Sequence, residues 1–311
     1  AVTIVPAMTK GPGAAEHVTM LQRTPTYVMP LPRVDRLALA LTKILGEKRG
    51  YAATRFKNIW QEHFIVEGLR RFPRAGRALI RHENIKSLGK DFDVDTHFTP
   101  PYDPWDQRLC AAPDGDFFQT LKAGDASIVT DSITRFSERG IVLSSGEELE
   151  ADIIVTATGL NLQLFDGMPI VVDGRRIDVV DTVAYRGTLL SGIPNWAMSI
   201  GYTTSSWTLK VSLLCRYFID LVKHMDAHGY DTVVPIATPG METRPVMDLQ
   251  SGYAKRGERL LPRQGMVKPW RTMMSYPQDA KALRGPVFDE HLVFGTRSAS
   301  RRVDEGHIAH V

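Results

Sequence analysis

The chain has 311 residues, 43% of them hydrophobic and 23% charged, with a formal net charge of +3, as expected for one large or two ordinary globular domains. So weak a charge gives no indication of nucleic-acid binding. The two cysteines, Cys110 and Cys215, lie far apart, which excludes a disulfide framework, a zinc ribbon and a paired thiol-redox centre.

The first residues predict a helix that is followed by a strand. A short apolar face indicates the helix and is formed by Val2, Ile4, Val5 and Met8. Gly11-Pro12-Gly13 ends it, and residues 17–23 predict the strand. A helix–strand pair is the second half of a βαβ unit, so we expect the first strand and its turn to lie outside this chain.

Helical periodicity and basic charge dominate residues 35–83. The apolar positions that carry the period include Leu37, Leu39, Leu41, Ile44, Phe56, Ile59, Trp60, Phe64, Ile65 and Leu69. Arg and Lys fill the positions between them, as on a solvated helix face. The segment TPPYDPWDQRLCAAPD (99–114) is rich in proline and aromatic residues and predicts a loop or an irregular crossing strand.

A meander of short strands is predicted next, at residues 127–130, 133–136, 140–143 and 148–150. It leads into ADIIVTATGLNL (151–162), where Ile153, Ile154 and Val155 form a continuous apolar run. Such a run suits a strand buried on both faces of a parallel sheet. It ends at Ala157-Thr158-Gly159. Taken alone, this pattern is equally typical of any buried strand of an α/β protein, with no functional role.

The remaining chain predicts a strand at residues 198–202 and a long amphipathic helix from Ser205 or Ser206 to Gly229. The predicted core face of this helix comprises Leu209, Leu213, Leu214, Tyr217, Phe218, Leu221, Val222 and Met225. Proline, glycine and charge dominate after residue 239, and residues 296–311 predict a disordered tail.

Arg23 is the first candidate for a binding residue. In a Rossmann unit the second strand ends either in an acid that binds the ribose of NAD or near an arginine that accommodates the 2′-phosphate of NADP. Here the strand ends in Gln22-Arg23-Thr24, and an arginine suits a bidentate phosphate contact. The alternative is an arginine that is simply exposed to water.

Two further segments could carry chemistry. Arg108, in WDQRLC, could stabilise an anionic intermediate, or it could form an ion pair with Asp103 or Asp106. The hydroxyl-rich segment at residues 202–207 lies at a strand-to-helix junction, where free amides bind acceptors, or it could hold a plain helix N-cap. No metal site is expected, because HMDAH (224–228) lacks the glutamate of HExxH.

These segments resemble the class B flavin-dependent monooxygenases, which comprise the Baeyer–Villiger and flavin-containing monooxygenases, and among them the ethionamide-activating type. The resemblance rests on HVTMLQRTPTYV (17–28), PYDPWDQRLC (101–110), DIIVTATGLNLQLF (152–165), LSGIPN (190–195) and GYTTSSWTLK (201–210), in that order. It implies an α/β, two-dinucleotide-binding-domain flavoprotein fold, incomplete at its N-terminus. Residues 1–158 would form the NADPH-binding domain, with a helical insertion at about 35–95, and residues 159–295 the C-terminal part of the FAD domain.

The resemblance also implies roles for individual residues. Arg23 and Thr24 would bind the NADPH 2′-phosphate, and Arg108 would match the active-site arginine. Gln107 stands where some relatives carry a lysine that contacts the same phosphate, which puts that contact in doubt. Residues near FAD would be Gly159, Thr203, Thr204 and Ser205.

The implied activity consumes NADPH and O2 and uses a flavin C4a-peroxide to insert one oxygen atom into a ketone, thioether, thioamide or amine. Both glycine-rich nucleotide motifs and the FxGxxxHxxxW signature are absent from the chain, so we expect a truncated polypeptide that binds FAD poorly. A truncated, non-catalytic fragment is therefore one alternative. A pyridine-nucleotide flavoprotein reductase is another, disfavoured by the absence of a redox cysteine pair.

No apolar run reaches the ~18 residues needed to span a bilayer, and residues 1–10 show no secretory signal. We therefore expect a cytoplasmic protein. The basic residues around positions 43–81 leave peripheral contact with a membrane open, and the oligomeric state is equally open.

Overall fold

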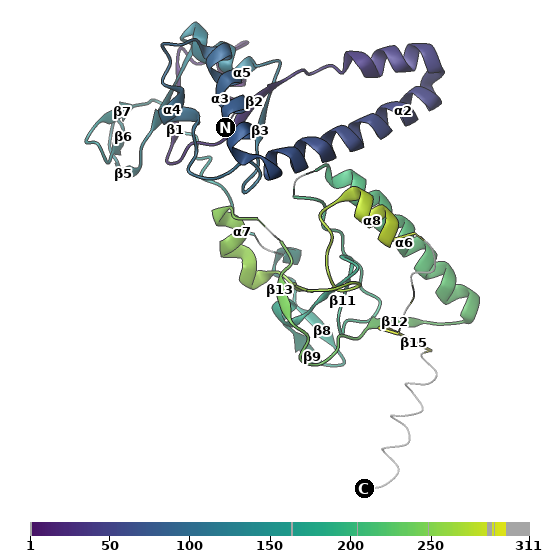
Figure 1. Ribbon diagram of the computed structural model, residues 1–311. Coiled ribbons are helices and arrows are strands. Elements are labelled where there is room, and N and C mark those ends of the chain that lie inside the picture. Colours follow the sequence, from purple (N-terminus) through teal and green to yellow (C-terminus); the bar gives the residue numbers. More distant parts are fainter. Residues whose placement is uncertain are drawn as a thin grey trace. The chain divides into compact units, whose positions relative to one another are not determined.

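The structure, a computed structural model, describes residues 2–162, 164–203, 205–247, 249–284, 288 and 290–296. The chain divides into two compact units, Ala1–Gly159 and Leu160–Val311 (Figure 1). We call them the N-terminal and C-terminal units and treat each by itself. Apart from Thr296, the predicted disordered tail lies outside the described residues.

Two parallel strand pairs form the centre of the N-terminal unit. After α1 (Ile4–Met8), β1 (Val18–Gln22) pairs with β4 (Ala126–Thr130), and β2 (Val28–Leu31) pairs with β3 (Cys110–Pro113). Parallel pairing requires long crossovers, and the helices between β2 and β3 supply one. The predicted helix and strand at the start of the chain are confirmed.

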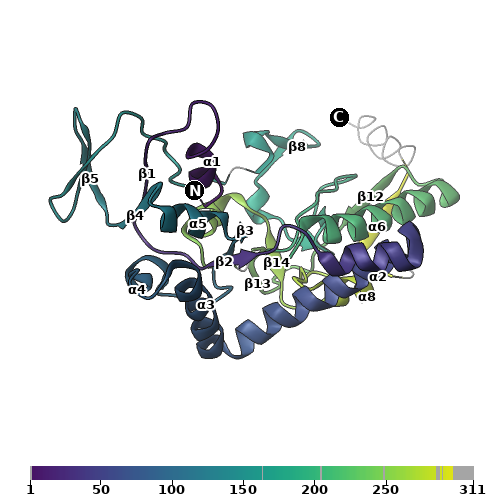
Figure 2. The same ribbon diagram turned by 90° about the horizontal axis from the view of Figure 1, so that it is seen from above.

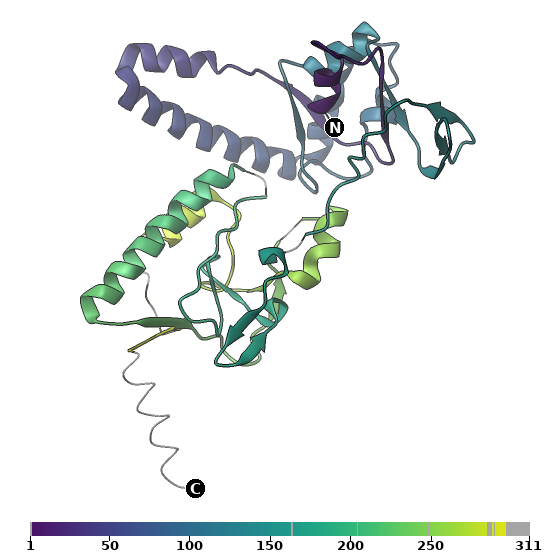
Figure 3. The same cartoon turned by 180° about the vertical axis from the view of Figure 1, so that it is seen from behind.

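The predicted helical region is also confirmed. It forms α2 (Arg36–Arg71), α3 (Pro73–Leu88) and α4 (Val94–Phe98), and α5 (Asp116–Ala123) follows β3. Helix α2 bends at Gly46, which has a φ of 76°, into the two arms visible in Figures 1 and 3. The arms meet at Gly50, where an added Cβ would lie 2.5 Å from Cα of Thr42.

The apolar positions of α2 are mostly exposed, contrary to what their spacing suggests. Phe56 and Phe64 are 67% and 65% exposed, whereas Ile59 is buried. The core of the unit comes instead from α3–α5 and the parallel strands and comprises Val2, Val5, Met20, Val28, Leu88, Val94, Phe98, Ala112, Phe117, Phe118, Leu121, Ala126 and Ile128.

The predicted meander is correct for three of its four strands. β5 (Ile133–Phe136), β6 (Gly140–Leu143) and β7 (Glu148–Glu150) form an antiparallel sheet, which Figure 2 shows apart from β1. The first predicted strand, at residues 127–130, is β4 and does not belong to this sheet. Because Ala126 and Ile128 are buried in the core, β4 pairs with β1 instead.

The predicted buried strand at residues 151–159 is wrong. The segment has no regular structure, and Ile153, Ile154 and Val155 are 78%, 40% and 50% exposed. A strand needs a neighbouring strand to take its backbone hydrogen bonds. Within the described chain only Ala151 has such a bond, to the carbonyl of Arg139.

The C-terminal unit combines short antiparallel strand pairs with helices. The pairs are β8 (Ile170–Val172) with β9 (Arg175–Ile177), β10 (Ala184–Tyr185) with β11 (Leu189–Leu190), β12 (Thr232–Pro235) with β15 (Leu292–Gly295), and β13 (Thr243–Pro245) with β14 (Arg263–Gly265). The α-helices are α6 (Trp207–His228), α7 (Gly252–Gly257) and α8 (Tyr276–Ala282). Short 3-10 turns lie at Leu164–Gly167, Val179–Asp181 and Glu258–Leu260.

The long amphipathic helix is confirmed as α6, which ends at Gly229 in a left-handed conformation. Its buried stripe comprises Lys210, Leu213, Leu214, Tyr217 and Leu221. Phe218 and Val222, predicted in the core, are exposed. The strand predicted at residues 198–202 is also wrong, although Met198 exchanges hydrogen bonds with Thr188.

None of the helices in the described ranges combines the length and the hydropathy that a bilayer span requires.

Candidate functional site

Arg23 and Thr24 lie in the bend that directly follows β1, and both are exposed. Arg23 makes no hydrogen bond or ion pair with any residue that the structure describes. The strand end beneath it is fixed, because Nε2 of Gln22 donates to the carbonyl of His97 at 2.8 Å and to Oγ1 of Thr130 at 2.9 Å. The guanidinium is therefore free at the tip of an anchored parallel strand.

Gln107 and Arg108 follow a tight turn that precedes β3. The turn is closed by a backbone hydrogen bond of 3.1 Å from Asp106 to Asp103. Arg108 is exposed and has no partner among the described residues. The alternative ion pairs are wrong: Asp103 pairs with Arg77 at 3.1 Å, and the carboxylate of Asp106 accepts from the amide of Asp103 at 3.1 Å.

Two tyrosines join these arginine segments. The Tyr27 hydroxyl donates to the carbonyl of Tyr102 at 2.6 Å, and the Tyr102 hydroxyl donates to Oγ1 of Thr26 at 3.1 Å. Their rings meet edge to face with centroids 5.6 Å apart. Burial raises the pKa of Tyr27 to about 12, which keeps its hydroxyl protonated as a donor. The bend after β1 and the loop before β3 thus pack together.

The residues of the two segments suit an anion. They comprise Arg23 and Arg108, whose guanidinium groups are unpaired among the described residues, together with Thr24 and the half-buried Gln107. The forked donors of arginine match phosphate oxygens in a bidentate manner, and hydroxyl and amide groups add further hydrogen bonds. We call this set the arginine surface.

The other predicted residues belong to different places. Gly159 ends the N-terminal unit, is exposed, has a φ of +95° and has open space around it. Thr203, 7% exposed, and the half-buried Ser205 lie in the C-terminal unit, and Thr204 lies outside the described residues. The Tyr27–Tyr102 contact joins the segments that carry Arg23–Thr24 and Gln107–Arg108, whereas Gly159, Thr203 and Ser205 lie outside these segments.

The segment before α6 is not a plain N-cap. Ser206 occupies the cap position, but its hydroxyl makes no capping bond and instead contacts Oγ1 of Thr208 at 2.8 Å. The hydroxyl groups of Thr203 and Ser205 also make no hydrogen bond with a described residue. Among the described residues, the first amides of α6 therefore have no side-chain acceptor, which leaves them able to bind a ligand.

A buried polar network beside this segment was not predicted. Oδ2 of Asp279 accepts from the Tyr202 hydroxyl at 2.8 Å and lies 3.1 Å from Nζ of Lys210. Burial raises the pKa of Asp279 and lowers that of Lys210. The sequence held one signal: Lys210 lies three, four and seven positions before Leu213, Leu214 and Tyr217, so it continues the buried stripe of α6.

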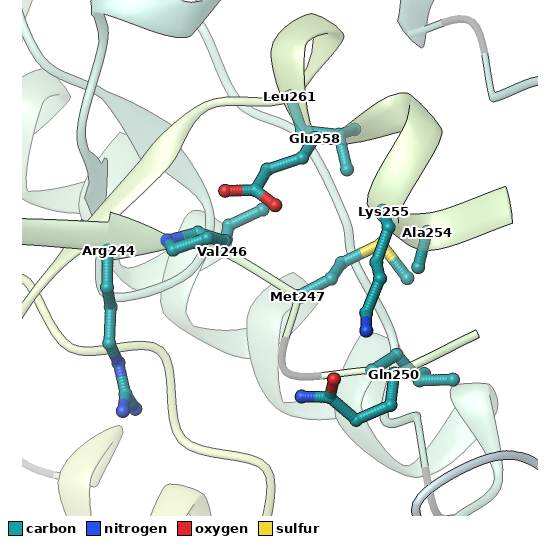
Figure 4. A pocket seen from close by; sticks show the side chains of 10 residues that line it. Arg244, Val246, Met247, Gln250, Ala254, Lys255, Glu258 and Leu261 are labelled. Atoms are coloured by element: carbon teal, nitrogen blue, oxygen red, sulfur yellow. The ribbon is translucent and has the colours of Figure 1, made fainter. Parts of the chain in front are cut away.

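Two of the cavities among the described residues of the C-terminal unit have no predicted site residue in their lining. The larger, of about 410 Å³, is lined by Arg244, Pro245, Val246, Met247, Leu249, Gln250, Ala254, Lys255, Glu258 and Leu261 (Figure 4). Nε of Arg244 is buried there without a hydrogen-bond partner. The smaller, of about 240 Å³, includes Arg186, Lys268, Arg271 and Asp279 in its lining.

The residues that the structure describes contain no cluster of three or more His, Cys, Asp or Glu side chains that could hold a metal ion. Cys110 and Cys215 are both free cysteines.

Comparison with known proteins relates the chain to flavin enzymes. It is 45% identical over 302 residues to the FAD-containing monooxygenase EthA of Mycobacterium tuberculosis, a match that covers 96% of this chain and 61% of EthA. It is 43% identical over 292 residues to the probable FAD-binding monooxygenase AlmA of Acinetobacter baylyi, covering 93% of this chain and 58% of AlmA. The chain thus spans about three-fifths of the length of these relatives. No family model matches.

Solved structures agree on the fold. The crystal structure of OTEMO in complex with FAD and NADP matches with a TM-score of 0.65 at 15% identity, over 95% of this chain and 65% of the other. This likeness places the chain in the α/β two-dinucleotide-binding flavoprotein fold of the Baeyer–Villiger monooxygenases, as predicted. The chain is thus similar in sequence to FAD-containing monooxygenases and shares the fold of the Baeyer–Villiger monooxygenases.

Proposed function

We propose that this chain serves an FAD- and NADPH-dependent monooxygenase that inserts one oxygen atom from O2 into a small organic ketone, thioether, thioamide or amine. The observation that carries the proposal is the arginine surface, in which Arg23 follows the end of the parallel strand β1 and Arg108 precedes β3, both unpaired among the described residues. It occurs in a chain that is 45% identical to an FAD-containing monooxygenase.

In this proposal the arginine surface binds NADPH. Arg23 and Thr24 bind the 2′-phosphate, because a free guanidinium and a hydroxyl at this strand end supply a bidentate and a single hydrogen bond. Gln107 contributes an amide and no charge, which makes Arg23 the main source of discrimination against NADH. Residues 1–158 then form the NADPH-binding domain.

Arg108 is the proposed catalytic residue. Its guanidinium stays charged at any physiological pH and supplies a fixed positive charge where negative charge develops during oxygen transfer. FAD, when bound, supplies the redox chemistry and the activation of O2. Gly159, Thr203, Thr204 and Ser205 would contact it, the hydroxyl groups by hydrogen bonds, and residues 159–295 would form the C-terminal part of the FAD domain.

Two measurements on the purified chain test the proposal. Titration with 2′,5′-ADP, and with 5′-AMP as the probe without the 2′-phosphate, should show tighter binding of the first. Addition of FAD, NADPH and thioanisole should then give the sulfoxide in proportion to the NADPH consumed. Equal affinity for both nucleotides would contradict the assignment of the arginine surface. NADPH oxidation that produces only hydrogen peroxide would contradict oxygen transfer.

A further inference from the structure

We define the hydroxyl loop as residues 202, 203, 205 and 206. Within the part of the C-terminal unit that the structure describes, one long-range side-chain hydrogen bond connects this loop to the rest of the unit. Thr203 and Ser205 make no hydrogen bond with a described residue, and Ser206 contacts only its neighbour Thr208. The Tyr202 hydroxyl alone reaches across 77 positions, to Oδ2 of Asp279 at 2.8 Å. Tyr202 is fully buried, so this bond is shielded from water.

The same carboxylate oxygen also forms an ion pair with Lys210 of α6. Nζ of Lys210 lies 3.1 Å from Oδ2 of Asp279 and donates to the carbonyl of Met273 at 2.6 Å. It also lies 5.1 Å from the centre of the Tyr202 ring. One oxygen atom of Asp279 thus connects the loop, the first turn of α6 and α8, which lies beside α6 in Figures 1 and 3.

A buried ion pair adds little net free energy to the stability of a fold. The desolvation of Lys210 and Asp279, 1% and 5% exposed, offsets most of their attraction, and apolar side chains of similar volume are often as stabilising. The ion pair instead fixes the orientation of the Asp279 carboxylate, so that this group accepts the hydrogen bond from the Tyr202 hydroxyl in one defined geometry.

We propose that Asp279 is a positioning residue, which acts through Tyr202 and Lys210 to hold the hydroxyl loop in the conformation that receives the flavin. This inference rests on the proposed function, in which Thr203, Thr204 and Ser205 contact FAD. In this role Asp279 acts through the side chains of Tyr202 and Lys210 and not by contact with the flavin itself. It holds the loop from α8, through the hydrogen bond to the Tyr202 hydroxyl.

The loop conformation can be followed without FAD. Trp207 packs on Gly201 next to the loop, whereas Trp270 is 2% exposed in the core of the same unit. In the full chain labelled with 5-fluorotryptophan, Tyr202→Phe should shift or broaden the 19F resonance of Trp207 and leave that of Trp270 unchanged. The matched control is Tyr230→Phe, since the Tyr230 hydroxyl makes no hydrogen bond with a described residue. Unchanged resonances, or equal changes at both tryptophans, would overturn the positioning role.

FAD affinity supplies the second measurement. Loss of a bond to a charged acceptor in Tyr202→Phe should raise the FAD dissociation constant about tenfold, and Tyr230→Phe should not. The double variant Lys210→Met/Asp279→Asn keeps the core neutral and the Tyr202 acceptor in place, so it should recover more of the affinity than Lys210→Met alone. No recovery, or an unchanged affinity in Tyr202→Phe, contradicts the inference. A wild-type chain that binds no FAD contradicts the proposed function instead, and the 19F result still decides the role of Asp279.

Discussion

Trp207 packs so closely on Gly201 that a Cβ at position 201 would lie 2.2 Å from Cγ of the indole. The contact joins Gly201, the residue before the hydroxyl loop, to the first residue of α6. Only glycine leaves room for it, because the clash involves the base of the tryptophan side chain and not its flexible end. The chain therefore folds back so that the residues on either side of the hydroxyl loop are in contact.

Gly201→Ala should therefore destabilise the C-terminal unit by about 1–3 kcal/mol, the usual cost of overpacking a close contact. Chemical denaturation of the variant and the wild type measures the difference. Gly68→Ala is the control, since nothing lies within 4 Å of an added Cβ there and alanine favours a helix over glycine. If Gly201→Ala unfolds at the same denaturant concentration as the wild type, the loop accommodates the added methyl group without loss of stability, and the prediction is wrong.

Arg23→Ala should weaken NADPH binding far more than NADH binding. A charged hydrogen bond to phosphate contributes roughly 1.5–3 kcal/mol, or a factor of about 10 to 100 in affinity, and NADH lacks the phosphate. Titrations with both nucleotides give the two ratios. Arg175→Ala, which removes another exposed and unpaired arginine from β9, should change neither. Equal losses for NADPH and NADH would show that Arg23 does not contact the 2′-phosphate.

The local patterns of the sequence predicted the elements that depend on neighbours in the chain. The periodicity of α2 and α6, the glycine that ends α6 and the tight turns of the β5–β7 meander are all local features. The arginine surface was predicted only as separate residues, since the packing of Tyr27 on Tyr102 that joins its parts spans 75 positions.

Features that depend on distant partners were predicted less well. The run at Ile153–Val155 has the composition of a buried strand, but burial requires a paired neighbour that the described chain does not provide. β4 fits a meander and a parallel pair equally well by sequence, and only the burial of Ala126 and Ile128 decides between them. Asp279 gave no signal, because nothing in the local sequence of α8 indicates that a lysine 69 positions earlier lies 3.1 Å away.

Arg108→Ala should abolish product formation while any FAD binding is retained, because the residue is proposed to act on charge and not on flavin affinity. Arg108→Lys keeps the charge without the planar fork, so it should retain part of the activity. Product yield per NADPH consumed measures both. Full product formation by the alanine variant would remove Arg108 from its proposed role.

Phe117→Ala should destabilise the N-terminal unit severely. Phe117 is fully buried, and its ring contacts Phe98 and Phe118 at centroid distances of 6.2 and 5.9 Å. Truncation of a buried phenylalanine costs about 3–5 kcal/mol, from lost burial and the cavity left behind. Phe136→Ala is the control, as Phe136 is exposed on β5. Similar unfolding free energies for both variants would contradict this description of the core.

Acidification should destabilise the N-terminal unit through His97. Burial lowers the pKa of this imidazole, and nearby Asp93 offsets part of the effect. Because the folded pKa lies below the unfolded value of about 6.5, His97 contributes stability that is present above that pH and is lost as the pH falls through the folded pKa. Nδ1 of the ring contacts Oγ1 of Thr130 at 2.9 Å, so His97→Asn can keep the hydrogen bond without a titrating group. The unfolding free energy of the wild type should fall more steeply than that of the variant between pH 7 and about pH 5. Parallel curves would show that other groups cause the acid sensitivity, since eight further histidines remain in the variant.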